Sequence, residues 1–328
     1  MTARHHVLAI GNALVDVITA AEPAFLEGQG IPKGVMRLIG ADEAEALYAA
    51  MGPGREISGG SAANTLAGMA ALGAKTHFVG RVADDQLGRV FAHDIRAAGV
   101  DFATAASTGG APTGRCLIVV TPDGDRTMNT FLGACQELSE ADLDADMVAA
   151  SEILYLEGYL WDPPAPRAAM RKAIAVARAN GRRVALTLSD VFCVEGHRAD
   201  FQQLLAEHVD LVFGNEHEVR ALYQTDLATA MTELARHACT TVITRSAAGA
   251  VVIAGGETHV VAAEPATRVL DTTGAGDLFA GGFMAALVEG RSLPDCARVG
   301  CIAAAEIISH YGARPEVDLK ALVKARLG

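Results

Sequence analysis

Residues 271–282 read DTTGAGDLFAGG, a run in which small residues stand between two acidic residues. Gly274 and Gly276 leave the backbone open to a ligand, and the unpaired N–H groups at a helix start attract anions such as phosphate. A carboxylate at Asp277 would repel such an anion, so it needs another use. It is either a proton acceptor beside the anion or a helix cap on a glycine turn, and the segment alone leaves both open.

The flanking residues predict how this segment is positioned. The preceding EPATRVL ends in β-branched and apolar residues, as a strand would, and the following residues predict a helix that ends at Gly290. The apolar residues at helical spacing are Leu278, Phe279, Phe283, Met284 and Leu287. We therefore expect a turn from a strand into a helix, with Asp277 at its mouth.

Two segments nearer the N-terminus could bind a polyol. In VLAIGNALVDVI an apolar strand would carry Asn12 and Asp16 on the same side, because strand side chains alternate with a period of two. In SGGSAAN, Gly59 and Gly60 permit close approach of the backbone, and Asn64 lies one turn into an expected helix, where its amide can bind hydroxyls. A glycine turn before a helix is the plainer explanation of the second segment.

Two later segments suggest a nucleotide side of the site. LVFGNEHEVRALY places Asn215 and Glu218 at the end of a strand and the start of a helix. An amide and a carboxylate at this spacing can hold water around Mg²⁺, although they also form an ordinary helix cap. TVITRSAAGAVVIAGG predicts a strand, a loop and a second strand, which could form a wall for a nucleotide.

Composition bounds the fold and the partners. The chain has 328 residues, of which 51% are hydrophobic, enough for one large domain or two smaller ones. Runs such as VALTL and TVIT alternate with alanine-rich helical stretches, the pattern of a parallel sheet covered by helices. A formal net charge of −12 without a basic patch argues against nucleic acid or an anionic membrane as partner.

The remaining features predict a cytoplasmic protein with reduced thiols. The sequence shows neither an apolar segment of membrane-spanning length nor a secretory signal, and its six cysteines form no C-x-x-C pair. The ten histidines show no metal-ligand spacing, and each is expected to be structural. GMAALGAKT at 68–76 lacks the P-loop lysine directly after its second glycine, and we interpret it as a helix capped by Gly73 before a strand. The glycines at 274 and 276 lack the third member of a dinucleotide fingerprint, where Phe279 stands.

Taken in order, these segments resemble the signatures of the ribokinase-like family of carbohydrate and nucleoside kinases. DTTGAGDLFAGG is similar to the family's C-terminal signature, GGSAANTLAGMAALGAKTHFVGRVADDQLG is similar to its N-terminal one, and NEHE lies between them. The resemblance spans nearly the whole chain. It implies one α/β domain over residues 1–328 with a three-layer α/β/α, Rossmann-like architecture and a mostly parallel central sheet. A small β-sheet lid would be formed by about residues 14–38 and 108–132.

The resemblance also implies roles in an ATP-dependent transfer of a phosphoryl group to an alcohol. Asp277 would be the catalytic base, the backbone of Gly274, Ala275 and Gly276 would form the anion hole, and the pair Asn215 and Glu218 would order magnesium and its water. The implied ATP contacts are Asn215, Thr244, Ser246, Gly249 and Gly276, with Ser246 at a position that is glycine in many relatives. Asp271 and Thr273 match two ligands of a monovalent cation, and dependence on potassium stays open.

Within the family, GNALVDVI, TGRCLIVVTPDGDRTMNTFLGA and YLEGYLWD look most like the adenosine kinase branch. The implied reaction converts adenosine to AMP, as in purine salvage, with the 5′-hydroxyl directed at Asp277. The implied substrate contacts are Asn12, Leu14, Asp16, Gly59, Gly60, Asn64 and Cys116, with Met36, Leu38 and either Tyr159 or Trp161 as further base contacts. Arg126 in GDRTM is either a clamp on the transferred group or a solvated turn residue.

Other functions remain open at this stage. The family includes kinases of free sugars such as fructose or ribose and of inosine or guanosine, and the apolar residues of the lid segments favour a nucleoside. A catalytically silent nucleoside-binding protein is disfavoured because Asp277, Asn215 and Glu218 are all present. Relatives occur as monomers and as homodimers joined through the lid, so the resemblance leaves both states open.

Overall fold

The computed structural model describes residues 4–327, and its largest element is a nine-stranded sheet. In order across the sheet, the strands are β14 (Glu257–Val261), β13 (Ala250–Ala254), β12 (Thr240–Thr244), β11 (Leu211–Asn215), β10 (Arg183–Thr187), β9 (Ser151–Glu157), β1 (His5–Ile10), β5 (Thr76–Val79) and β6 (Val100–Phe102). All neighbours from β12 to β6 are parallel, and β13 and β14 are antiparallel additions at one edge.

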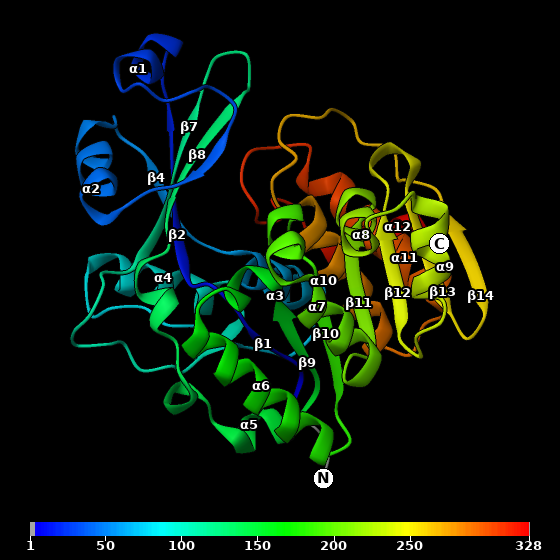
Figure 1. Cartoon of the computed structure of the whole chain (residues 1–328). Helices are drawn as coiled ribbons and strands as arrows, with labels where there is room; N and C mark the ends of the chain where they lie inside the picture. The colour runs from blue at the N-terminus through cyan, green and yellow to red at the C-terminus, as the bar shows by residue number, and fades with distance from the viewer. Residues whose placement is uncertain (1–3, 328) are drawn as a thin grey trace.

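Helices cover both faces of this sheet (Figure 1). One face carries α3 (Ser61–Ala71), α4 (Gln86–Ala97), α10 (Ala275–Val288), α11 (Leu293–Ile307) and α12 (Leu319–Leu327), and the other carries α5 (Ala145–Ala149), α6 (Pro164–Ala179), α7 (Val191–Glu207), α8 (Glu216–Tyr223) and α9 (Leu227–Leu234). Strand β9 shows why there are two cores: Ile153 and Tyr155 join the first, while Leu154 and Leu156 join the second. The predicted three-layer α/β/α architecture is confirmed.

A second, five-stranded sheet stands to one side of the body (Figure 1). Its order is β3 (Met36–Leu38), β8 (Arg126–Phe131), β7 (Gly114–Val120), β2 (Leu14–Ala20) and β4 (Arg55–Gly59). Both segments expected to form a lid contribute strands, and β4 joins them from outside those segments. Helices α1 (Pro23–Gly28) and α2 (Ala41–Ala50) add buried residues behind it. Val15 and Val17 of β2 face this packing, and the alternate residues Leu14 and Asp16 face the opposite side.

The chain crosses from the large to the small sheet at 11–13. We expected Asn12 and Asp16 on one strand, and that expectation is wrong, because β1 ends at Ile10 and β2 starts in the other sheet. The crossing packs tightly on Gly60, which has φ +96°, and a Cβ there would lie 2.1 Å from the carbonyl oxygen of Asn12. Only glycine fits such a close backbone approach with a positive φ.

The helix after the glycine-rich run begins and ends as predicted, whereas the strand before it is absent from the described structure. Helix α10 runs from Ala275 to Val288. Residues 262–274 are irregular, and the N–H of Leu270 donates instead to the carbonyl of Ile308 at 2.8 Å. Val269 is exposed, so the apolar run that suggested a strand has no sheet to enter. Gly73 does end the turn after α3 before β5, as predicted.

Short 3-10 turns complete the described elements, namely η1 (Gly133–Glu137), η2 (Glu140–Asp142), η3 (Gly158–Trp161) and η4 (Ser246–Ala248). All six cysteines are buried as free thiols. Within residues 4–327, no helix combines the length and the apolar character that crossing a membrane requires.

Candidate active site

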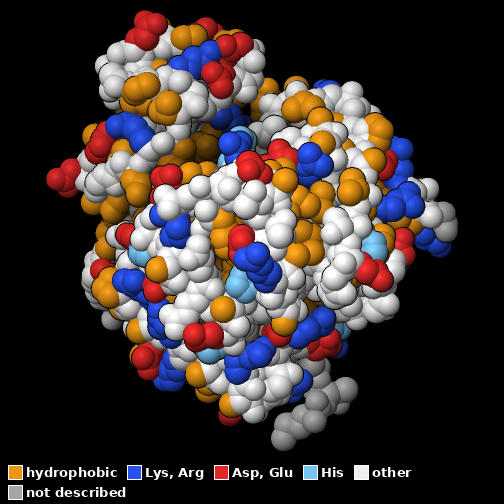
Figure 2. All heavy atoms as spheres, turned by 45° about the vertical axis from the view of Figure 1, so that its right-hand side comes forward, with side chains coloured by type: hydrophobic (Ala, Val, Ile, Leu, Met, Phe, Trp, Pro, Cys, Tyr) orange, Lys and Arg blue, Asp and Glu red, His pale blue; other side chains and the backbone are white. Residues whose placement is uncertain are grey.

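A cavity of about 660 Å³ lies where the small sheet meets the body. Figure 2 shows the surface hollowed below the small lobe, with hydrophobic side chains in the hollow. Its floor is formed where β9, β11 and β12 end and α10 begins, the edge at which open parallel sheets bind ligands. The predicted residues that line it are Asn12, Leu14, Asp16, Met36, Leu38, Gly60, Asn64, Cys116, Tyr159, Asn215, Glu218, Thr244, Thr273, Gly274, Gly276 and Asp277.

Asp277 is held in the first turn of α10 by two side chains of α3. Ser61 Oγ donates to one carboxylate oxygen at 2.6 Å, and Asn64 Nδ2 donates to the other at 3.0 Å. Desolvation raises the pKa of Asp277, and the two hydrogen bonds oppose this rise. Ser61 was not predicted, although it lies inside the SGGSAAN segment. The carboxylate is thus fixed in orientation, and its raised pKa strengthens it as a proton acceptor.

The start of α10 has the geometry of an anion site. Gly274 is the residue before the helix and adopts φ +76°, and no side chain among the described residues caps the helix. The first-turn N–H groups therefore remain available, and Gly274 and Gly276 both line the cavity. Ala275 belongs to the same turn but is not a lining residue.

Arg314 lies behind the cavity wall and supplies positive charge near Asp16 and Asp277, and no motif in the sequence reveals it. Its Nη2 donates to the carbonyl oxygen of Ser58 at 2.6 Å and to Ser58 Oγ at 2.9 Å, and its Nη1 contacts Asn64 Oδ1. Burial raises the pKa of Asp16 to about 6, and the guanidinium of Arg314 opposes that rise. Arg314 likewise lowers the pKa of Asp277.

Glu157 is a second residue that the sequence did not single out. It is fully buried at the end of β9, where Oε1 accepts hydrogen bonds from Asn12 N at 2.7 Å and Asn12 Nδ2 at 2.6 Å. Its Oε2 accepts from Ala62 N at 2.9 Å, at the start of α3. Burial raises the pKa of Glu157 to about 7, and these donors oppose the rise. One carboxylate therefore joins β9, the crossing between the sheets and α3.

Asn215 and Glu218 form the helix cap that was one of their two predicted roles. Asn215 Oδ1 accepts from Glu218 N at 2.9 Å, and Glu218 Oε2 accepts from Asn215 N at 2.9 Å. Both residues nevertheless line the cavity, and burial raises the pKa of Glu218 to about 7. Thr244 lines the same side, whereas Ser246 and Gly249 lie in the loop beyond it and do not reach the cavity wall.

Asp271 lies behind the anion loop. It is buried and forms an ion pair with Arg126 at the start of β8, with Nη2 and Oδ2 2.8 Å apart. Its oxygens also accept from Thr273 N at 3.0 Å and Gly312 N at 3.1 Å. Arg126 does not line the cavity, so in this conformation it is neither a clamp on a transferred group nor a solvated residue.

The small sheet presents an apolar roof to the cavity. Four apolar side chains of its strands line the cavity, namely Met36, Leu38, Ile118 and Met128. Of the two aromatic candidates, Tyr159 lines the cavity, whereas Trp161 is wholly buried in the second core and donates to Asp200 at 2.8 Å. The predicted role of Trp161 is therefore wrong.

Two further placements complete the comparison of the site with the sequence. Phe192, which was not predicted, lines the cavity near Tyr159, with ring centroids 5.9 Å apart and 46% of its surface exposed. Gly59 pairs with Leu14 at the end of β4 and is not a lining residue, although a side chain there would collide with the Asp16 carboxylate.

The fold and the site define a kinase of small molecules with an α/β body and a β-sheet beside its cleft. Residues 35–319 match the model of the pfkB family of carbohydrate kinases, and the chain belongs to this family. It is therefore a phosphotransferase that acts on an alcohol group, with ATP as the implied phosphate donor.

Solved structures and characterised relatives agree with this assignment. An adenosine kinase from Sinorhizobium meliloti is 50% identical, with a TM-score of 0.92 over 99% of this chain and 100% of that chain. A probable sugar kinase from Rhizobium etli CFN 42 is 46% identical, with a TM-score of 0.92 over 99% of both chains. Adenosine kinase 1 from Arabidopsis thaliana is 29% identical over 332 residues, which cover 93% of this chain and 94% of that protein.

Glu157→Gln should destabilise the protein by about 1–3 kcal/mol, because the new amide group would face N–H donors and leave one of them unpaired. The free energy of unfolding from urea denaturation measures this loss. Glu152→Gln, on the same strand and partly exposed, is the control and should change stability by less than about 0.5 kcal/mol. Equal losses in the two variants would contradict the bridging role of Glu157.

Proposed function

We propose that this protein transfers the γ-phosphoryl group of ATP to the 5′-hydroxyl of a nucleoside, with adenosine as substrate and AMP as product. The observation that carries the proposal is the position of Asp277. Its carboxylate is oriented by Ser61 and Asn64, stands at the open start of α10 and faces a cavity roofed by apolar side chains. A base, an anion site and an apolar enclosure are therefore found together.

Polar groups suited to a ribose lie between the roof and the base. Asp16 lines the cavity from β2 of the small sheet, and Asn64 lines it from α3 of the body. Gly60, the residue before α3, also lines the cavity. A carboxylate can accept hydrogen bonds from vicinal hydroxyls, and an amide can both donate to them and accept from them. Asn12 donates its amide to Glu157, so we assign it to positioning the crossing rather than to direct contact.

The roof supports a nucleoside over a free sugar. The cavity offers apolar and aromatic surface that a purine can cover, from Met36, Leu38, Ile118, Phe192 and Tyr159. A flat base gains stability by stacking on aromatic side chains, whereas a free sugar has hydroxyls on all sides and leaves such surface unused. The 50% identity to an adenosine kinase points the same way.

Thr244, Asn215 and Glu218 would face the nucleotide, with Ser246 and Gly249 shaping the loop behind Thr244. The donor set fits magnesium held through water, because Glu218 and Asn215 offer oxygen atoms. Burial and the nearby Asp190 and Asp277 disfavour the charged form of Glu218, and a cation beside it would offset that cost. When bound, Mg²⁺ supplies positive charge that offsets the charge of the phosphates. Asp271 pairs with the guanidinium of Arg126 in this conformation, so a monovalent cation at this position would share that carboxylate with Arg126.

The chain's own groups account for the transfer. Asp277 accepts the proton of the 5′-hydroxyl as its oxygen attacks phosphorus, and Ser61 and Asn64 keep the accepting oxygens aimed during this step. The N–H groups of Gly274, Ala275 and Gly276 stabilise the negative charge on the transferring group. The roof excludes water, which would otherwise compete with the nucleoside for the phosphoryl group.

A second candidate function is the phosphorylation of a free sugar. It is favoured by the 46% identity to a probable sugar kinase, and the polar floor would serve a sugar hydroxyl in the same way. The two candidates differ only in what the roof covers.

Asp277→Asn should lower kcat by roughly 10²–10⁴, the contribution of a general base, while nucleoside binding is retained. A coupled ADP-release assay measures turnover, and calorimetric titration with adenosine measures binding. The matched control is Asp295→Asn, in the first turn of the neighbouring helix α11, which should leave both unchanged. Turnover near that of the parent protein would remove Asp277 from the mechanism.

Arg314→Met should move the acidic limb of the pH profile of kcat/KM to higher pH. The positive charge of Arg314 lowers the pKa of Asp277, so its loss leaves the base protonated to a higher pH. Arg314→Lys should restore much of the original profile, and the exposed Arg298→Met is the control. An unshifted profile in a folded Arg314→Met variant would show that the guanidinium does not tune the base.

Substrate choice is tested by turnover with adenosine, inosine, guanosine, ribose and fructose. We expect the highest kcat/KM with adenosine, and we expect Phe192→Ala to raise its KM roughly tenfold through lost stacking while a weak activity with ribose stays unchanged. Val260→Ala, at an exposed apolar position on β14, is the control. Turnover with a free sugar alone would contradict the assignment of the roof and leave the role of Asp277 intact.

A further inference from the structure

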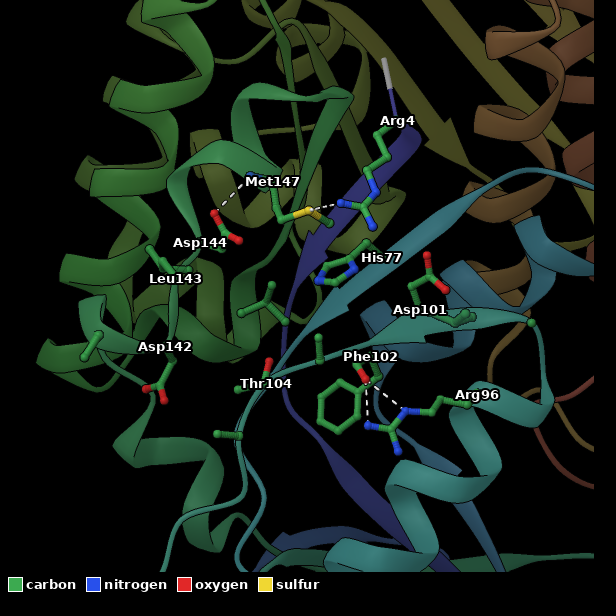
Figure 3. Close-up of a pocket in the computed structure, with 16 residues that line it drawn as sticks. Arg4, His77, Arg96, Asp101, Phe102, Thr104, Asp142, Leu143, Asp144 and Met147 are labelled. Atoms are coloured by element: carbon green, nitrogen blue, oxygen red, sulfur yellow. Dashed lines mark hydrogen bonds between the residues drawn. The ribbon is translucent and has the colours of Figure 1, made fainter. Parts of the chain in front are cut away.

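A second cavity of about 820 Å³ lies beside β6, at the edge of the large sheet. Its lining includes residues of β5 and β6, residues 141–144, Met147 and Arg4, and none of its lining residues lines the active-site cavity. Figure 3 shows His77 among the lining residues, with Arg4, Met147 and Asp101 around it. The proposed kinase reaction uses no residue of this cavity.

Three groups with metal-binding chemistry lie together here, and two of them, His77 and Asp101, line the cavity. His5, His77 and Asp101 each offer a ligand atom, and these atoms all lie within 4.8 Å of one another. His5 Nε2 is 2.8 Å from Asp101 Oδ2, and the two imidazole centroids are 5.2 Å apart. The residues come from three adjacent strands, β1, β5 and β6, and His77 and Asp101 are direct partners across the β5–β6 pair.

The two imidazoles are buried without adequate hydrogen-bond partners. His5 is 3% exposed and His77 is 6% exposed. The Nδ1 atoms of both rings are buried and have no partner among residues 4–327. Buried polar atoms in folded proteins are nearly always paired, so an unpaired nitrogen on each of two adjacent imidazoles needs an explanation, and a bound ion would supply one.

We propose that His5, His77 and Asp101 bind one divalent transition-metal ion, with zinc as the preferred ion. Two imidazoles and one carboxylate suit zinc and its neighbours, whereas magnesium and calcium prefer oxygen ligands alone. Ligand atoms around tetrahedral zinc lie about 3.3 Å apart, given bonds of about 2.0–2.2 Å, so the side chains need only small rotations. Asp101 is free to make such a rotation because its side chain is 69% exposed.

The ion would tie the outermost strand of the sheet to its two neighbours. Strand β6 has three residues and pairs only with β5 in the large sheet, so it contributes few hydrogen bonds of its own. Three protein ligands leave one position of a tetrahedral ion open, and water from the cavity can occupy it. The site would thus stabilise the sheet edge without entering the kinase reaction.

The test is titration of the untagged, nucleotide-free protein with Zn²⁺ and Co²⁺, followed by calorimetry and by the Co²⁺ absorption spectrum. We expect one equivalent per chain, a four-coordinate Co²⁺ spectrum, and a rise in Tm of roughly 5 °C when Zn²⁺ is at one hundred times its dissociation constant. Asp101→Ala should weaken binding at least about 100-fold and abolish the rise in Tm. His77→Phe tests the buried ligand in the same way.

The control is Glu257→Ala, which breaks a similar exposed pair with His259 on β14, at the opposite edge of the same sheet. It should leave metal binding unchanged, and kinase activity in Mg²⁺ should be unaffected in all these variants. Asp101→Ala keeps the test decisive if His77→Phe does not fold, because Asp101 is exposed. Absence of binding below about 100 µM, or binding that survives Asp101→Ala, would overturn the proposal.

Discussion

The buried carboxylate of Glu157 is the interaction on which the rest of the site depends. It stands at the end of β9 and bonds both the crossing at Asn12 and the first turn of α3 at Ala62. Helix α3 carries Ser61 and Asn64, which orient Asp277, and the crossing leads directly into β2, which carries Asp16. One buried group thus sets the position of Asp277, the proposed base, relative to Asp16 on the other side of the cavity.

Four desolvated carboxyl groups lie around the site, and burying them costs stability. Burial raises the pKa of Asp16, Glu157, Glu218 and Asp277, which means that the folded state resists charging each of them. Carboxylates with raised pKa values gathered around one cavity are typical of functional sites. Arg314 is the cation that moderates Asp16 and Asp277, and the proposed magnesium would do the same near Glu218.

What the sequence predicted correctly was mostly local. The start of α10 and the cap formed by Asn215 and Glu218 depend on residues within one helical turn, so spacing reveals them. Glu157 and Phe192 reach the cavity, and Arg314 reaches the side chain of Asn64 at its wall, only through tertiary packing, and no neighbouring residues mark them. The apolar run ending at Leu270 resembled a strand, but its backbone bonds to Ile308 instead of a sheet. The ten histidines likewise looked unrelated, because only sheet pairing brings His5 and His77 together with Asp101.

The ion pair between Arg126 and Asp271 gives the small sheet a mechanical link to the anion loop. Arg126 starts β8 and its guanidinium lies over the ring of Tyr311 at 5.4 Å, while Asp271 fixes Thr273 and Gly312 through their backbone N–H groups. Swinging the small sheet away from the body would separate two buried charges, which is costly because each would lose its only partner of opposite charge at this contact. The roof and the loop before α10 therefore move together. In the proposed reaction, closing the roof over the substrate would then be coupled to completing the anion site at α10, because Leu38 and Asp277 lie on opposite sides of this link.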